Sequence, residues 1–317
     1  ICCHNRPRKM AELVDENTHT QDMDASQAVL DSVRAHQVLP DTFAAGGFLP
    51  LAQMRDCLLP DNHPEAPTLK NGVATAADGT IHVATVVEFP GVSPLAFAWW
   101  FAEGCSGDEE YQTWHPEDHL SGHFVEGTSF EASGGAEQSH EEPWVGREHV
   151  VVEALGAQFG GRLQSLRIKF CSPNVYGIDR ADLQAANCDV ILTARVCVRD
   201  PGLGWLDVGH FVHFTQPLTG GVGGFELRSR FWLGDVYLPP EASIVKRVLS
   251  TVVTLAANNR VMRAMFARLI EGRSPLELAV ANWRHATEEF SVLASFLASK
   301  HAKAVAGSKT EGTAAKS

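Results

Sequence analysis

The feature that most constrains the fold of this chain is a series of strand-like segments with turn signals between them. Five of these segments follow one another after residue 143, and turns such as Pro201-Gly202 separate them. They span residues 144–155, 163–170, 190–198, 205–215 and 224–232. Two earlier segments, residues 73–77 and 81–89, flank Asp78-Gly79, a pair that is typical of a tight hairpin turn. The pattern predicts a sheet of antiparallel strands.

The C-terminal part of the chain carries a helical pattern instead. Residues 241–270 and 275–300 place apolar residues three and four positions apart, as amphipathic helices do. Shorter helices are expected at residues 24–35 and after Ser93-Pro94, where proline occupies a tolerated first-turn position. We therefore expect an α+β fold in which a curved sheet wraps around the last helix and encloses a cavity. The alternative is a two-layer sandwich without a cavity.

A single domain between two polar ends is the expected organisation. Its parts are a disordered extension (1–23), an N-terminal helical arm (24–70), a core (71–305) and a disordered tail (306–317). Met10-Ala-Glu-Leu reads like a natural start, and whether the residues before Met10 are native is left open.

Composition excludes several classes of function. The net charge of −12 argues against a nucleic-acid surface, which needs clustered lysine and arginine. No apolar run reaches the length of about 18 residues that spans a bilayer, so no membrane partner is expected. The seven cysteines contain no Cys-x-x-Cys pair, which indicates reduced thiols and a cytoplasmic setting.

The stretch from Tyr111 to His123 is the first candidate for a functional site. It contains three histidines and two carboxylates directly after an aromatic run: His115, Glu117, Asp118, His119 and His123. Imidazole and carboxylate are the ligands that zinc and similar divalent metals prefer. A histidine-rich surface loop is the alternative interpretation.

Two later segments supply further candidate ligands. Glu153 lies between apolar residues on one face of its strand, where an ionised carboxylate is costly unless it is paired or bound to a metal. In the last helix, His285 and Glu289 are four positions apart and project from the same side. Glu288 could replace Glu289, and an exposed His/Glu pair without a metal is the alternative.

The strand 205–215 presents two histidines on opposite faces. His210 shares its face with apolar residues such as Val212 and Phe214, whereas His213 shares the other face with Asp207 and Thr215. This alternation predicts that His210 points into the cavity. A neutral core histidine with a backbone partner is the alternative.

Taken together, these motifs resemble one known family. Tyr111-x-x-Trp-His-Pro-x-Asp-His119, Val152-Glu153, His210-Phe-Val, Glu226-Leu-Arg-Ser-Arg-Phe-Trp232 and His285-x-x-x-Glu289 are similar to those of the 2,4-diacetylphloroglucinol hydrolase and phloretin hydrolase family. The resemblance runs from about residue 89 to residue 290 and rests on the order of the motifs. It implies a START-like helix-grip fold, also seen in the birch-pollen allergen, and a zinc ion.

The resemblance also implies a ligand set. The first histidine of the family follows a substrate-contacting tyrosine by eight positions, which matches His119 and Tyr111 and passes over His115 and His123. The remaining ligands match Glu153, His285 and Glu289, and a catalytic histidine matches His210.

Two positions depart from the family pattern. Gly122 stands where the family carries a substrate-binding asparagine, and Phe231 stands where it carries a second tyrosine. Because both changes remove a hydrogen bond to a substrate hydroxyl, we expect a bulkier or less hydroxylated substrate than an acylphloroglucinol.

The activity implied by the resemblance is zinc-dependent hydrolysis of the carbon–carbon bond between an acyl group and a phenolic or polyketide-derived ring, in a retro-Claisen sense. His210 would transfer protons, Glu153 would act as ligand and proton acceptor, and Tyr111 would position a substrate oxygen. The expected partner is a small aromatic ketone, and a homodimer is one option for assembly. The alternatives are a non-catalytic helix-grip protein for a hydrophobic ligand and a zinc-dependent ester or lactone hydrolase.

Overall fold

An eight-stranded antiparallel sheet forms the centre of the computed structural model, which describes residues 10–37, 47–126, 143–157, 160–200, 204–220, 223–237, 254 and 258–314. The strand order is β1-β2-β8-β7-β6-β5-β4-β3, and neighbouring strands are antiparallel. The strands are β1 (Gly72–Thr75), β2 (Ile81–Pro90), β3 (His119–Phe124), β4 (Glu148–Glu153), β5 (Gln164–Cys171), β6 (Ile191–Asp200), β7 (Gly204–Pro217) and β8 (Gly224–Tyr237).

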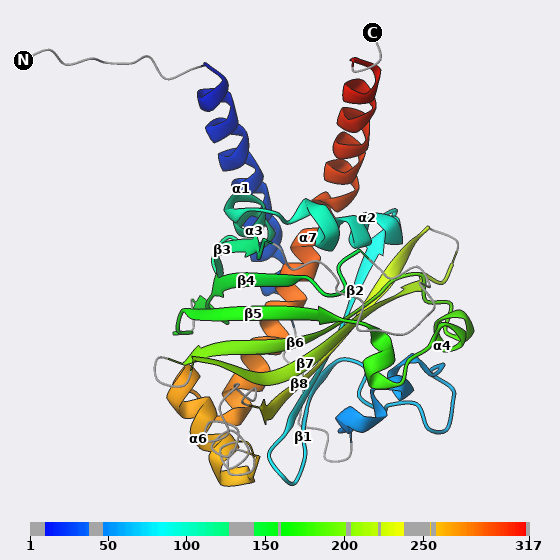
Figure 1. Cartoon of the computed structure of the whole chain (residues 1–317), viewed down its shortest axis with the longest axis vertical. Helices are drawn as coiled ribbons and strands as arrows, with labels where there is room; N and C mark the ends of the chain where they lie inside the picture. The colour runs from blue at the N-terminus through cyan, green and yellow to red at the C-terminus, as the bar shows by residue number, and fades with distance from the viewer. Residues whose placement is uncertain are drawn as a thin grey trace, which may run out of the picture.

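The helices lie around this sheet (Figure 1). They are α1 (Met10–His36), η1 (Leu51–Leu58), α2 (Pro94–Trp99), η2 (Trp100–Gly104), α3 (Asp108–Trp114), η4 (Pro173–Tyr176), α4 (Arg180–Ala185), α6 (Arg260–Glu271) and α7 (Pro275–Ala314). The long helix α7 contacts β2 and β1 on one side and α1 on the other. The predicted α+β helix-grip architecture, a curved antiparallel sheet around a long C-terminal helix with an N-terminal helical arm, is confirmed.

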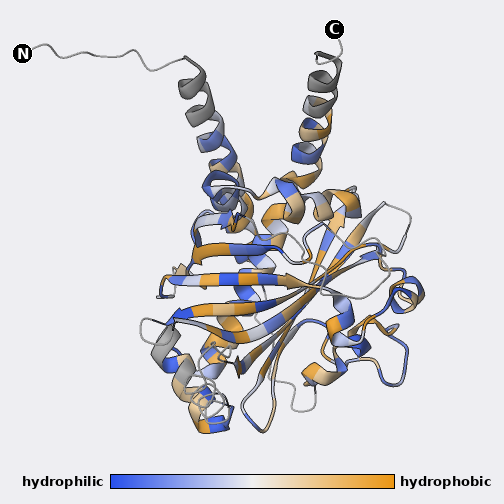
Figure 2. Cartoon of the chain, in the orientation of Figure 1, coloured by the Kyte–Doolittle hydropathy of each residue, from blue (hydrophilic) through white to orange (hydrophobic). Residues whose placement is uncertain are grey.

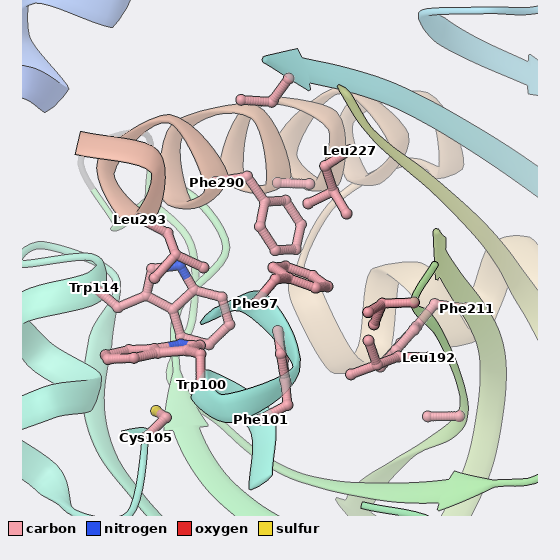
Figure 3. Packing of buried hydrophobic residues seen from close by; sticks show 14 of the residues in the cluster. Phe97, Trp100, Phe101, Cys105, Trp114, Leu192, Phe211, Leu227, Phe290 and Leu293 are labelled. Atoms are coloured by element: carbon pink, nitrogen blue, oxygen red, sulfur yellow. The ribbon is translucent and has the colours of Figure 1, made fainter. Parts of the chain in front are cut away.

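The strands β6 to β8 are buried on both faces, because a different set of helices covers each face. On the inner face, Phe290 and Leu293 of α7 pack against aromatic residues of α2, η2 and α3, including Phe97 and Trp100 (Figure 3). On the outer face, a second core joins η1 and Ile178 to Phe214 and Trp232. Figure 2 shows the consequence: apolar residues are frequent along the strands. Apolar character alone therefore does not identify the inner face.

The helix ends differ from the sequence prediction. The helix α1 begins at Met10, within the extension (1–23) that was expected to be disordered, and α7 continues to Ala314, within the expected tail (306–317). Polar composition indicated disorder, but α1 contains neither proline nor glycine and is rich in good helix formers. The helix α6 begins at Arg260, where Asn259 caps it, and most of the predicted helical segment before it lies outside the described residues.

Candidate metal centre

The histidine-rich stretch folds as helix, turn and strand rather than as a surface loop. The helix α3 ends at Trp114, a tight turn contains His115 and Asp118, and β3 begins at His119. The side chains of His115, Asp118 and His119 are buried at this corner, whereas His123 is exposed further along β3.

Four predicted ligands converge at the corner. His119 at the start of β3 pairs with Glu153 at the end of β4, and α7 brings His285 and Glu289 from the opposite side. The Nε2 atom of His119 lies 3.4 Å from Nε2 of His285 and 3.7 Å from an oxygen of Glu153 and of Glu289. The Nε2 atom of His285 lies 3.7 Å from the same Glu289 oxygen. All four side chains are buried.

Hydrogen bonds orient both imidazoles toward this cluster. His119 donates from Nδ1 to the backbone carbonyl of Tyr111 at 2.9 Å, and His285 donates from Nδ1 to Asp118 at 2.9 Å. Asp118 also accepts the backbone N–H groups of Gly156 and Ala157, each at 2.7 Å. Because both Nδ1 atoms carry the proton, both Nε2 lone pairs are available to a cation, as in carboxylate–histidine–metal triads.

The distances fit a small divalent ion. Donors that share a tetrahedral zinc at about 2.1 Å lie about 3.4 Å from one another. The Nε2 atom of His119 lies 3.4 to 3.7 Å from a donor atom of each of the other three residues, and His285 lies 3.7 Å from Glu289. His119, Glu153 and His285 each offer one ligand atom within 4.8 Å of the others. Two imidazoles and two carboxylates are a donor set that zinc accepts.

The pKa values of His285 and Glu289 indicate that the carboxylates of the cluster carry excess negative charge when no ion is bound. Burial lowers the pKa of His285, but the carboxylates of Glu289, Asp118 and Glu153 outweigh this effect and raise it to about 10. Burial raises the pKa of Glu289 to about 8, although the charge on His285 opposes the rise. Burial and the two neighbouring histidines lower the pKa of His119 well below its usual range. Without an ion, the cluster is therefore stabilised by protons that a divalent cation would replace.

His115 and Glu288, the alternative ligands, form a supporting layer behind the cluster. The Nδ1 atom of His115 accepts the backbone N–H of Asp118 at 3.1 Å, so the ring proton is on Nε2, which lies 3.3 Å from Glu288. Glu288 also accepts two hydrogen bonds from Arg34, each at 3.0 Å. His115, Asp118 and His285 are close enough to hold a second ion, but a proton occupies the His115 nitrogen that would bind it. The geometry favours His119 and Glu289 as ligands.

A cavity of about 190 Å³ opens beside the four donors. Its walls come from the inner faces of β4 to β8, from α6 and from α7, and most of its lining is apolar or aromatic. Tyr111 forms part of the wall: its hydroxyl donates a hydrogen bond to Glu153, and its ring stacks on His119 with centroids 3.8 Å apart. Burial and the charge of Glu153 raise the pKa of Tyr111 well above its usual value, so the phenol stays protonated.

The prediction that His210 points into the cavity is wrong. His210 lies on the outer face of the sheet, where its Nδ1 atom is 2.8 Å from the Tyr176 hydroxyl and its Nε2 atom is 2.8 Å from Asp235. A register shift between Asp207 and Gly209 interrupts the strand alternation, and the outer face is itself an apolar core. His213 is the histidine of β7 that lines the cavity.

Of the two positions that depart from the family pattern, the structure places one at the cavity. Phe231 lines it, with its ring 5.5 Å from that of His213. Gly122, on β3, is not one of the cavity-lining residues but packs against one of them, since a Cβ atom there would be 2.8 Å from Cγ of Tyr111. Gly122 is therefore required for the close packing of Tyr111 rather than for contact with a substrate.

Sequence reasoning missed three polar groups that line the cavity and have a buried atom without a hydrogen-bond partner: His149, His213 and Asn282. His213 has one ring nitrogen buried without a hydrogen-bond partner, and burial lowers its pKa to about 3. Asn282 lies one helical turn before His285, and its Oδ1 atom is buried without a partner. The spacing of Asn282 and His285 at i and i+3 was a signal that could have identified Asn282.

Comparisons with known proteins identify the family of most of the chain. A family model described as DAPG hydrolase PhiG domain matches residues 49–301. No curated protein has a sequence that matches this chain. Among solved structures, the crystal structure of Ara h 8.0201 is 15% identical, with 57% of this chain and 96% of that chain covered and a TM-score of 0.26. An uncharacterised protein from Rhizobium leguminosarum is 13% identical, with 58% of this chain and 96% of that chain covered and a TM-score of 0.23.

In the described part of this chain, no helix combines the length and the apolar character needed to cross a membrane.

Proposed function

Because the chain belongs to the DAPG hydrolase family, a group of phloroglucinol-type carbon–carbon hydrolases, we propose that it is a zinc-dependent enzyme that removes an acyl group from a phenolic or polyketide-derived ring. The observation that carries this proposal is the convergence of four buried donors, three of which line an apolar cavity: Glu153, His285 and Glu289. A cavity of this kind suits an aromatic ketone.

His119, Glu153, His285 and Glu289 would hold the ion. Bound there, zinc supplies a Lewis acid that polarises a carbonyl or lowers the pKa of water. Asp118 and the Tyr111 carbonyl orient the two imidazoles. These contacts fix the donors before any ion arrives, so that little reorganisation is needed on binding.

Tyr111 and Glu153 would act together on the reacting carbonyl. The Tyr111 hydroxyl donates to Glu153, and its raised pKa keeps the phenol protonated. Glu153 has a second oxygen and can accept a proton from the attacking water. The phenol can turn from Glu153 to a substrate oxygen when the substrate enters.

His213, rather than His210, would transfer the proton on the ring side. Its low pKa leaves the imidazole neutral at neutral pH, with one N–H to donate and one lone pair to accept. Negative charge that develops on the ring oxygens of a bound substrate would raise this pKa toward the operating pH, where proton transfer is most efficient. The reaction needs such a transfer: water adds to the acyl carbonyl, the carbon–carbon bond breaks with its electrons going to the ring, and the ring carbon takes a proton. A neutral His213 can accept the proton of a phenolic hydroxyl and deliver it to that carbon.

The lining of the cavity supports a substrate with few hydroxyl groups. Phe231 places a ring without a hydroxyl beside His213. Asn282, His149 and His213 are uncharged polar groups of the wall, each with a buried atom that lacks a hydrogen-bond partner. An aryl ketone with one or two hydroxyls could bond to these groups and fill the apolar remainder.

Elemental analysis of the purified protein, followed by assays in ¹⁸O-labelled water, tests the proposal. The substrates would be diacetylphloroglucinol, phloretin, a less hydroxylated aryl ketone and an aryl ester. We expect about one zinc per chain and ¹⁸O in the released carboxylic acid from ketone substrates. Cleavage of the ester alone would favour an ester hydrolase. A protein that binds these ketones without zinc and without turnover would be a binding protein.

A further inference from the structure

The N-terminal helix α1 reaches the metal centre through one side chain, although it precedes the matched residues 49–301. Arg34, in the last turn of α1, has a side chain that is 16% exposed. Its Nε and Nη2 atoms each donate to Glu288 at 3.0 Å, and its Nη1 atom donates to Glu117 at 2.7 Å. One guanidinium group therefore holds two carboxylates from distant parts of the chain.

These two carboxylates belong to the two halves of the donor set. Glu288 precedes Glu289 on α7, the helix that also carries His285. Glu117 lies two positions before His119, in the turn that also carries Asp118. Arg34 thus links α7, which carries His285 and Glu289, to the turn that precedes His119.

Each end of this connection is reinforced. On the turn side, Gln27 of α1 donates to the same Glu117 oxygen at 2.8 Å. On the helix side, Glu288 is 2% exposed and also contacts Nε2 of His115, whose ring stacks on that of His285 with centroids 5.0 Å apart. A carboxylate this deeply buried is costly without a cationic partner, and Arg34 supplies one with bidentate geometry.

We propose that Arg34 is a positioning residue of the metal centre: it sets the distance between the turn that bears His119 and the helix that bears His285 and Glu289. This inference rests on the proposed zinc centre. Loss of Arg34 would leave Glu288 buried beside the ligands without its partner and would free the turn from α7. The donors would then be less well placed, and the affinity for zinc would fall.

Zinc affinity, measured by competition with a chromophoric chelator, tests this role independently of turnover. Arg34→Gln should weaken zinc binding by about 10-fold, within the range usual for groups that orient ligands. Arg34→Lys should give an intermediate loss, because an ammonium group keeps the charge but cannot hold both carboxylates in bidentate geometry. The double variant Arg34→Gln/Glu288→Gln should recover part of the loss, because it no longer buries an unpaired carboxylate.

The matched control is Arg55→Gln. It breaks an exposed ion pair with Asp182 far from the donors, and should leave zinc affinity unchanged. If Arg34→Gln fails to fold, Glu117→Ala removes the turn side of the bridge and should weaken zinc binding several-fold. A wild-type protein without zinc would refute the zinc centre. A wild-type protein with zinc, and Arg34→Gln or Glu117→Ala variants with wild-type affinity, would refute the role of Arg34 alone.

Discussion

His119 and His285 bring their Nε2 atoms to 3.4 Å from each other, although 166 positions separate them in the sequence. The Nδ1 atom of His119 donates a hydrogen bond to the Tyr111 carbonyl, and the Nδ1 atom of His285 donates one to Asp118. So close an approach fits a shared partner: in the ion-free protein it is the proton that the raised pKa of His285 places on Nε2, and a divalent cation could replace that proton.

Replacement of His285 by alanine should abolish zinc binding. The variant loses one ligand and leaves Asp118 without its imidazole partner, so stoichiometry should fall from about one ion per chain to near zero. Elemental analysis after gel filtration measures the change. His123→Ala is the control, since His123 is exposed on the same strand as His119. An alanine variant that retained a full complement of zinc would show that this ligand set is wrong.

Zinc binding should weaken steeply as the pH falls. The raised pKa values of His285, about 10, and Glu289, about 8, mean that both groups hold protons in the ion-free protein below pH 8. Each bound ion should therefore displace about two protons, and affinity should fall about 100-fold per pH unit between pH 8 and 6. Calorimetry in buffers with different ionisation enthalpies counts the protons. Affinity that did not change over this range would contradict the assigned ligands.

His213→Ala should retain zinc and lose turnover by roughly 10²-fold or more, the usual effect of removing an acid or base. The physical reason is that His213 faces the cavity and contacts none of the four donors among the described residues. His210→Ala is the contrast: it loses the contacts with Tyr176 and Asp235 on the outer face, so its main effect should be on the melting temperature. Steady-state kinetics on folded protein separates the two. If His210→Ala lost turnover and His213→Ala kept it, His210 would be the proton-transferring residue instead of His213.

Phe231→Tyr should shift selectivity toward more hydroxylated rings. A hydroxyl at this position would enter the cavity beside His213 and could bond a phenolic group. One hydrogen bond between neutral groups contributes about 1 kcal/mol, so kcat/KM for an acylphloroglucinol should rise about fivefold relative to a less hydroxylated ketone.

Gly122→Asn gives the opposite expectation. The added Cβ atom would be 2.8 Å from the Tyr111 ring, which itself packs on His119. The substitution should therefore lower stability and zinc retention instead of raising acylphloroglucinol turnover, which thermal unfolding and elemental analysis would detect. Unchanged stability together with a gain of turnover would place residue 122 at the substrate after all.

Local sequence patterns predicted site residues correctly where the spacing of those residues follows the period of the helix or strand that carries them. The i, i+4 spacing of His285 and Glu289 holds on α7, and the odd carboxylate among apolar residues at Glu153 lies on the buried face. His210 could not be placed in this way, because it shares its face with Val212 and Phe214, and that apolar face packs in the outer core instead of lining the cavity. The contacts of Arg34 span 254 positions to Glu288, and no local pattern carries information of that range.

The position of β3 in the sheet has a further consequence. It is the last strand, with β4 as its neighbour on one side and no strand on the other in the described sheet, and His119 begins it. An ion shared between His119 and α7 would act as a cross-link from the free edge of the sheet to the enclosed helix. It would convert the intervening 166 positions into a closed loop, which restricts the unfolded chain. The ion would then stabilise the packing of the sheet around α7 and also take part in the reaction. Removal of the ion by a chelator should therefore lower the stability of the fold together with the activity.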